Sequence, residues 1–243
     1  IHPDKEILFQ GVSFSVSENT KCAISGHNGC GKSTLLKIMA HRLRPASGIV
    51  FSKSKPYFIP QHFGQYDSLT VAALGVSDEI RALHAILDGD VSENNLTCLN
   101  DKWDIEEQAV AALDKWHIGS VALDTSLSTL SGGEKTKVFL AGISLHDPEI
   151  ILMDEPTNHL DLKGREMLYE YILQSSKTVV VVSHDRTLLN LMSAIYEMSA
   201  EGIRFYPVGY DEYKAQKDAE LRSKMAQLQN RQKELRKARK EAR

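Results

Sequence analysis

The chain has 243 residues, of which 42% are hydrophobic and 25% are charged, and its formal net charge is −3. This length allows a buried core, and no apolar run approaches the roughly 20 residues of a membrane-spanning helix, so we expect no membrane insertion. The cysteines lack the spacing of a metal site, which favours a reducing, cytoplasmic setting. Because the chain starts at Ile1 without a methionine, we expect it to be a piece of a longer protein.

Short apolar and β-branched runs predict several strands around one helix at the start of the chain. The helix is expected at 35–39. The strands are expected at 7–9, 12–16, 21–25, 48–51 and 57–59.

A glycine-rich run lies between the predicted strand at 21–25 and the helix at 35–39. It reads Gly26-His27-Asn28-Gly29-Cys30-Gly31-Lys32-Ser33-Thr34 and fits the phosphate-binding pattern G-x-x-x-x-G-K-[ST]. Glycines let the backbone curl so that N–H groups point at a phosphate, and the following helix adds the positive end of its dipole. We expect Lys32 between the β- and γ-phosphates of a nucleotide and Ser33 on Mg²⁺. The simpler alternative is a glycine-rich turn before an ordinary helix.

Residues 63–145 are predicted to be mainly helical. Residues 77–79 are expected to cap a helix over 80–87, followed by a polar loop over 88–100 and a second helix over 104–116. The run Ser131-Gly132-Gly133-Glu134 begins a third helix that extends to about residue 142. Exposed N–H groups and the dipole at such a helix start attract an anion. Because the glycine-rich run is already expected to bind phosphate in this chain, we expect the second site to contact a nucleotide that is bound to another molecule.

Two acidic residues follow a very apolar predicted strand at 150–153. Asp154 is well placed to hold Mg²⁺ through water, and Glu155 can polarise an attacking water as general base. The alternative is a solvated turn, but the strand before it is too apolar for a sheet edge. A second buried strand is predicted at 178–182 and ends beside His184, and a hairpin is predicted from strands at 195–198 and 203–206.

The tail from Lys214 to Arg243 differs from the rest of the chain, because Lys and Arg outnumber Asp and Glu by more than two to one. Its apolar residues follow the spacing of an amphipathic helix and are Leu221, Met225, Leu228 and Leu235. The basic residues near its end suit contact with phosphates and are Arg231, Lys233, Arg236, Lys237, Arg239, Lys240 and Arg243. The alternative, with equal weight, is a solvated helix between two domains whose charges only keep it soluble.

The order of these motifs resembles that of ATP-binding cassette (ABC) ATPases. The run Thr129-Leu130-Ser131-Gly132-Gly133-Glu134 resembles their signature, Asp154-Glu155 their Walker B motif, and Ser183-His184-Asp185 their histidine switch. The resemblance implies that His184 touches the γ-phosphate, and that Gln61 links Mg²⁺ and water to the helical region. The D-loop would consist of Asn158, His159, Leu160 and Asp161.

The resemblance also implies the fold and the mode of action. We expect an α/β P-loop NTPase domain over 1–213, with a mixed-sheet core, an antiparallel β subdomain and a helical signature subdomain at about 63–145. A charged helix over 214–243 is expected to follow. In this family two cassettes sandwich two ATP molecules head to tail, so Ser131–Glu134 would serve the ATP of a partner cassette. The residue that stacks on adenine is expected before Ile1.

Several sequence variants resemble the ABC-F subfamily in particular. They are the D-loop Asn158-His159-Leu160-Asp161, the run Ser183-His184-Asp185-Arg186, Glu134 after the signature, and Gly209-Tyr210-Asp211-Glu212-Tyr213 before the tail. The resemblance implies a cytoplasmic protein with two cassettes joined by a charged helix that enters the ribosome. Its partners would be a second cassette, in the same chain or a homodimer, and the ribosome with its rRNA and tRNA.

Two other functions remain open. The chain could be the ATPase subunit of a membrane transporter, with the segment after Gln61 docking a membrane partner. It could also be a nucleotide-gated clamp that binds nucleic acid through its helix and hydrolyses ATP only to reset. Within the ABC-F reading, the motifs do not separate a translation factor from a protein that protects ribosomes against antibiotics.

Overall fold

A mixed β-sheet forms the centre of the protein. The computed structural model describes residues 7–61, 68–199 and 201–241. Among them, six strands pair in the order β2-β3-β4-β1-β5-β6, and only β5 and β6 pair antiparallel. The strands are β1 (Lys21–Gly26), β2 (Tyr57–Ile59), β3 (Ile150–Asp154), β4 (Thr178–Val182), β5 (Ala194–Ser199) and β6 (Gly202–Tyr206).

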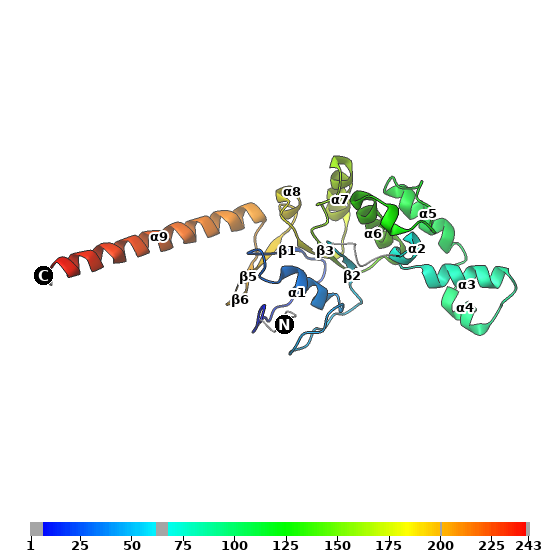
Figure 1. Ribbon diagram of the computed structural model, residues 1–243, viewed down its shortest axis with the longest axis horizontal. Coiled ribbons are helices and arrows are strands. Elements are labelled where there is room, and N and C mark those ends of the chain that lie inside the picture. Colours follow the sequence, from blue (N-terminus) through cyan, green and yellow to red (C-terminus); the bar gives the residue numbers. More distant parts are fainter. Residues whose placement is uncertain (1–6, 62–67, 200, 242–243) are drawn as a thin grey trace.

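The central strands are apolar on both sides because helices cover both faces of the sheet (Figure 1). On one face, α1 (Lys32–Met39) packs its leucines against Cys22 and Ile24 of β1. On the other face, α7 (Leu162–Gln174) and α8 (Arg186–Leu189) pack against alternate residues such as Ala23. The predicted strands at 21–25, 57–59, 150–153 and 178–182 and the hairpin are confirmed.

A helical region lies beside the sheet (Figure 1). Its buried residues form one continuous hydrophobic core with the sheet face that α7 covers. It contains α2 (Thr70–Ala73), α3 (Ser77–Leu87), α4 (Glu93–Leu99), α5 (Ile105–Lys115), the 3₁₀ turn η1 (Leu127–Thr129) and α6 (Gly132–His146). The predicted helical subdomain is therefore present, except that residues 62–67 lie outside the described residues.

Two details of the helical region were predicted wrongly. The polar loop expected at 88–100 contains α4, because Leu99 is fully buried and so fixes this polar segment to the core. Asn100 then ends the helix in the left-handed conformation, which Asn tolerates well. Ser77 is the first residue of α3 and not its cap, since the capping position is Val76 and no side chain caps the helix.

The expected strands at 7–9, 12–16 and 48–51 are not formed. Gly11 has a positive φ of 67° and interrupts the first stretch, which contacts the core through side chains such as Phe9 and Phe14. The carbonyl of Ser15 accepts a hydrogen bond from the Tyr196 hydroxyl at 2.6 Å instead of pairing in a sheet. Among the described residues, the antiparallel strand pairing is that of β5 with β6.

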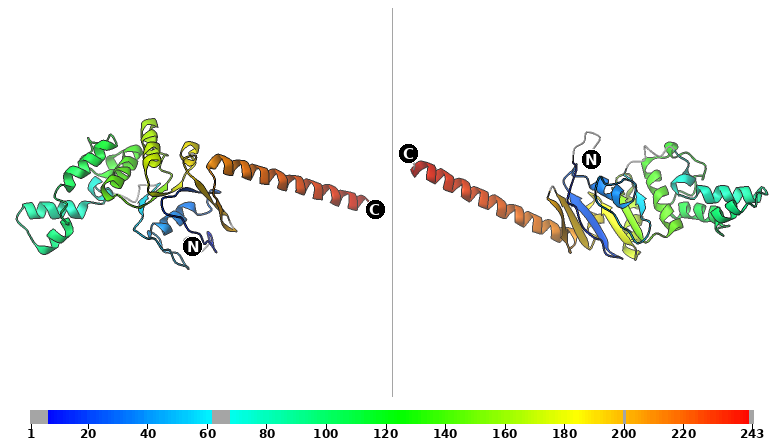
Figure 2. Two further views of the ribbon diagram at one scale, coloured as in Figure 1. Left: turned by 180° about the vertical axis from the view of Figure 1, so that it is seen from behind. Right: turned by 90° about the horizontal axis from the view of Figure 1, so that it is seen from below.

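The tail forms one long helix, α9 (Tyr210–Glu241), which begins four residues before the predicted start. The earlier start follows from packing, because Tyr213 is only 5% exposed and its ring lies edge-on to that of Tyr206, 5.0 Å away. Beyond its first turns the helix projects away from the sheet (Figure 2). Leu221, Met225 and Leu228 are each more than half exposed there. In the part of the chain that is described, no helix is apolar enough over sufficient length to cross a membrane.

Candidate phosphate site at the carboxyl edge of the sheet

The carboxyl ends of β1, β3 and β4 meet at one edge of the sheet, because these strands are parallel and pair in register. Gly26 ends β1, Asp154 ends β3, and His184 lies two residues beyond β4. Open parallel sheets generally bind ligands at this edge. The fold therefore brings the separate sequence motifs into one place.

The glycines of the run Gly26–Thr34 are required by the shape of the loop. Gly29 and Gly31 have φ of 80° and 100°, a conformation that other residues rarely adopt. A Cβ on Gly26 would lie 2.5 Å from the carbonyl oxygen of Met198, and one on Gly31 would lie 2.8 Å from the ring of Phe9. Gly31 also precedes α1, so the loop leads directly into a helix start that attracts anions.

Lys32 lies across this loop. Its side-chain ammonium donates hydrogen bonds to the carbonyls of Gly26, at 2.8 Å, and His27, at 3.0 Å, and the residue is 9% exposed. A buried ammonium needs such partners, and a phosphate oxygen could replace either carbonyl. The loop thus holds a cation at the place where the sequence predicts phosphate.

Ser33 and Asp154 meet although they lie 121 positions apart in the chain. The Ser33 hydroxyl donates to the Asp154 carboxylate at 3.0 Å, and Asp154 is 2% exposed. Both are hard oxygen donors, which suit Mg²⁺. The described residues include no cluster of three or more His, Cys, Asp or Glu side chains able to hold a metal ion. A Mg²⁺ ion here would therefore take its remaining ligands from phosphate and water, as it commonly does.

Glu155 and His184 form the next contact along this edge. The Glu155 carboxylate lies 3.4 Å from Nε2 of His184 and accepts a hydrogen bond from the His184 backbone N–H at 3.3 Å. Burial raises the pKa of Glu155, and the neighbouring His184 opposes that rise. Glu155 also has a positive φ of 48°, held by a hydrogen bond from its N–H to the carbonyl of Val182 at 2.8 Å. Such strain at a non-glycine residue is typical of functional sites.

The signature residues form a capping box at the start of α6. The Ser131 hydroxyl accepts from the N–H of Glu134 at 3.3 Å, while the Glu134 carboxylate accepts from the Ser131 N–H at 2.8 Å. Ser131 also donates its hydroxyl hydrogen to this carboxylate, at 2.7 Å, which lowers the pKa of Glu134. The helix start that was expected to attract an anion thus already holds a carboxylate of its own.

The D-loop packs against the signature within this single chain. A Cβ on Gly132 would lie 3.0 Å from the His159 ring, and one on Gly133 would lie 2.7 Å from the His159 carbonyl oxygen. Asp161 caps α7 by accepting from the Gly164 N–H, and its carboxylate lies 3.3 Å from the Lys137 ammonium of α6. The hydrogen bond from Gly164, followed by that from Lys137, lowers the pKa of Asp161.

The structure brings together Lys32, Ser33, Asp154, Glu155 and His184 at the predicted site. Gln61 lies two residues beyond β2, whose last residue, Ile59, is in register with Met153 of β3, so Gln61 is near the same edge. The segment that directly follows it lies outside the described residues.

The sequence alone does not indicate the residues that support the loop from behind. Phe9 and Met198 press against its glycines, yet ordinary apolar residues carry no motif. Tyr169 donates a hydrogen bond to Asp185 at 2.5 Å and so ties α7 to the residue after His184.

Comparison with known proteins agrees with this geometry. The sequence profile of the family described as ABC transporter matches residues 9–158. The solved dimeric structure of a post-hydrolysis state of the ATP-binding cassette MJ0796, bound to ADP and Pi, has a TM-score of 0.63 with this chain at 24% identity. It covers 84% of this chain, which in turn covers 91% of that one. This likeness confirms the fold.

Three curated relatives each match more than 90% of this chain. They are the tylosin resistance ATP-binding protein TlrC of Streptomyces fradiae, at 32% identity, the energy-dependent translational throttle protein EttA of Escherichia coli strain K12, at 31%, and ABC transporter F family member 2 of Arabidopsis thaliana, at 32%. The last of these confirms the expected resemblance to ABC-F proteins. The chain spans only 45%, 44% and 30% of their respective lengths.

Proposed function

Because the chain belongs to the ABC transporter family, whose cassettes bind ATP, we propose that the loop Gly26–Thr34 binds ATP and that the chain hydrolyses it to ADP and phosphate. The observation that carries this proposal is the convergence of Lys32, the Ser33–Asp154 pair and the Glu155–His184 pair at one sheet edge. Phosphoryl transfer depends mainly on positioning and on charge stabilisation, and these residues provide both.

Lys32 and the start of α1 bind the phosphates. The ammonium exchanges its hydrogen bonds to the carbonyls of Gly26 and His27 for bonds to the β- and γ-phosphates, and the loop N–H groups surround the β-phosphate. Ser33 and Asp154 would hold Mg²⁺ on the bound nucleotide, and this ion would neutralise charge that develops on the phosphate oxygens.

Glu155 acts as the general base. Its carboxylate is buried beside the loop and can accept a proton from a water that is in line with the γ-phosphate. Its raised pKa makes it a stronger base than an exposed glutamate. His184, whose ring is already within 3.4 Å of this carboxylate, orients the water and contacts the γ-phosphate. Gln61 would link a bound Mg²⁺ ion and water to the helical region.

The signature Ser131–Glu134 serves the nucleotide of a second cassette, in the same full-length protein or in a homodimer. It belongs to the helical region and contacts the D-loop residue His159, so a nucleotide held by a partner can influence both. ATP binding would then close two cassettes on each other, and hydrolysis would be efficient only in the closed pair.

For the whole protein we propose action on the ribosome, as a translation factor or as a ribosome-protection protein. Three observations support this: relatives named as a translational throttle and as an antibiotic resistance protein, a cassette that continues into a basic helix, and the projection of α9 into solvent. A basic helix free of the cassette suits contact with RNA phosphates. The cytoplasm is the corresponding location.

One experiment tests hydrolysis, and a second tests the ribosome role. Purified protein should bind ATP in calorimetry and release phosphate with Mg²⁺, and an absence of ATP binding at millimolar nucleotide would refute the proposal. For the second test, full-length protein with Glu155→Gln is held in its ATP state and sedimented with ribosomes. Failure to co-sediment at moderate salt would favour the transporter subunit, which would instead be isolated with a membrane partner.

The basic tail permits a matched control in the ribosome experiment. Replacing Arg236 and Lys237 by Glu should weaken ribosome binding steeply and flatten its salt dependence, because fewer phosphate contacts release fewer counterions. Replacing the cassette residues Arg42 and Arg44 by Glu changes the net charge equally, but should leave ribosome binding nearly intact. An equal loss in both variants would indicate unspecific attraction to RNA.

A further inference from the structure

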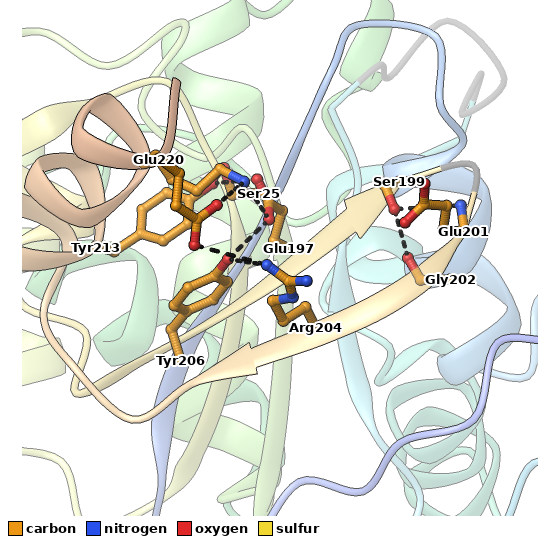
Figure 3. A network of polar contacts seen from close by, with 10 residues as sticks. Ser25, Glu197, Ser199, Glu201, Gly202, Arg204, Tyr206, Tyr213 and Glu220 are labelled. Carbon is orange, nitrogen blue, oxygen red and sulfur yellow. Dashed lines mark hydrogen bonds and ion pairs between the residues drawn. The ribbon is translucent and has the colours of Figure 1, made fainter. Parts of the chain in front are cut away.

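A cluster of polar residues joins the first turns of α9 to the sheet immediately beside the phosphate loop (Figure 3). Glu197 of β5 is in register with Ser25 of β1 and with Arg204 of β6, so these side chains leave the same face of the sheet. The members that carry the argument are Ser25, Glu197, Tyr206, Tyr213, Lys217 and Glu220.

Glu197 is the centre of this α9-root cluster. Its carboxylate accepts hydrogen bonds from the hydroxyls of Tyr213, at 3.0 Å, and Tyr206, at 3.2 Å, and from the ammonium of Lys217 at 3.0 Å. Burial opposes its charge, but the bonds from Lys217, Tyr213 and Tyr206 together lower the pKa of Glu197. The pKa of Lys217 is raised by the same pair. The ion pair therefore stays charged throughout the neutral range and is not a pH switch.

Tyr213 connects this cluster to the nucleotide loop. Its hydroxyl lies 3.4 Å from Oγ of Ser25, the residue directly before Gly26. Gly26 in turn makes two contacts outside the cluster. Its carbonyl accepts a hydrogen bond from Lys32, and its Cα packs against the backbone of Met198, the residue after Glu197. Gly26 therefore contacts Lys32 and β5 and adjoins Ser25, so a shift of Gly26 when Lys32 moves to a phosphate would displace Ser25 and β5 as well.

We propose that Tyr213 is a positioning residue for the phosphate loop, so that the first turns of α9 support ATP binding and are themselves ordered by it. The inference rests on the proposed binding of ATP at Gly26–Thr34. Tyr213 touches no substrate and acts through Ser25. Because coupling between two sites is reciprocal, a contact that strengthens ATP binding must also be strengthened by ATP.

Removal of one hydroxyl tests the proposal. Tyr213→Phe keeps the buried ring but breaks the contact to Ser25 and Glu197, and it should weaken ATP affinity about 3- to 10-fold, the range expected for one hydrogen bond. Tyr210→Phe is the matched control, because Tyr210 lies in the same helix turn with its ring 6.0 Å from that of Tyr213 but is not a member of the cluster. It should bind ATP like the wild type.

The reciprocal effect is measured by amide hydrogen exchange over residues 211–217, with and without ATP and Mg²⁺. In the wild type and in Tyr210→Phe, ATP should slow exchange in these turns, and in Tyr213→Phe this slowing should be lost. A merely structural tyrosine would change thermal stability but would leave the ATP-dependent slowing intact. Ser25→Ala, which breaks the same contact from the other side, serves as the second variant if Tyr213→Phe does not fold.

Each result separates this inference from the proposed function. If the wild type does not bind ATP, the proposed function fails. If the wild type binds ATP and Tyr213→Phe binds it equally well with the same slowing of exchange, the inference alone is overturned. Equal losses in Tyr213→Phe and Tyr210→Phe would also overturn it, because they would reflect a general loosening of α9.

Discussion

Replacement of Glu155 by Gln tests the assignment of the general base most directly. Loss of a general base commonly slows catalysis about 10²- to 10⁴-fold, which corresponds to about 2.7–5.5 kcal/mol of transition-state stabilisation. ATP binding should persist, because the substituted amide retains an oxygen that can accept from the His184 N–H, and Lys32 is untouched.

The structure also fixes the sign of the stability change in this variant. Burial raises the pKa of Glu155 in the folded state above its unfolded value, so the ionised carboxylate destabilises the fold at neutral pH. A neutral amide removes that cost, and the melting temperature at pH 7 should be equal or higher. A loss of activity with unchanged or improved stability cannot be attributed to unfolding.

The assay is single-turnover phosphate release with Mg²⁺, with full-length protein in excess over ATP. Glu155→Asp is the control, because it keeps the carboxylate but withdraws it by one methylene, and its rate should fall between those of the wild type and Glu155→Gln. If Glu155→Gln turns over at more than a tenth of the wild-type rate, Glu155 is not the base.

Four further outcomes are expected. Lys32→Ala removes the cation that meets the phosphates and should weaken ATP binding at least tenfold, or about 1.4 kcal/mol or more, in calorimetry; unchanged affinity would contradict its role. Gly31→Ala combines a φ of 100° with a 2.8 Å contact to Phe9 and should lower the melting temperature, whereas an unchanged melting temperature would show that the loop tolerates a Cβ. Ser131→Arg should leave ATP binding by this chain intact but prevent closure on a second cassette, and small-angle scattering that still detected ATP-driven compaction would refute the sandwich. The rate should fall as the pH is lowered through the raised pKa of Glu155, because only the ionised form accepts a proton, and a rate that stayed constant through mildly acidic pH would argue against a carboxylate base.

The motif residues could be predicted because each lies next to a recognisable sequence feature, either an apolar strand or a glycine-rich loop. Asp154 is the last residue of one strand that is buried on both faces, and His184 follows another. The glycines at 26–31 adopt a backbone conformation that other residues resist. Parallel strand ends must share an edge, so the convergence of these motifs followed from their order alone. The fold of the central sheet was predictable for the same reason.

The remaining features depend on contacts between distant segments. The sequence around α4 is polar, and only the burial of Leu99 decides that it is helical. The predicted strands at 12–16 and 48–51 have strand-like residues, but neither segment pairs as a strand among the residues that the structure describes. The capping of α6 by Glu134 and the contact between Tyr213 and Ser25 depend on side-chain positions, which spacing along the chain does not determine.

The length of α9 gives its attachment a mechanical consequence. At a rise of about 1.5 Å per residue, its 32 residues form a rod of roughly 48 Å. If it pivots at its first turn, a rotation of about 5° there moves the far end by about 4 Å, more than the length of a hydrogen bond. A small rotation at the first turn of α9 would thus move the basic far end of the helix far enough to break or form several hydrogen bonds and ion pairs. Amplification of this kind requires only that the helix be stiff and that it rotate as one unit about its first turn.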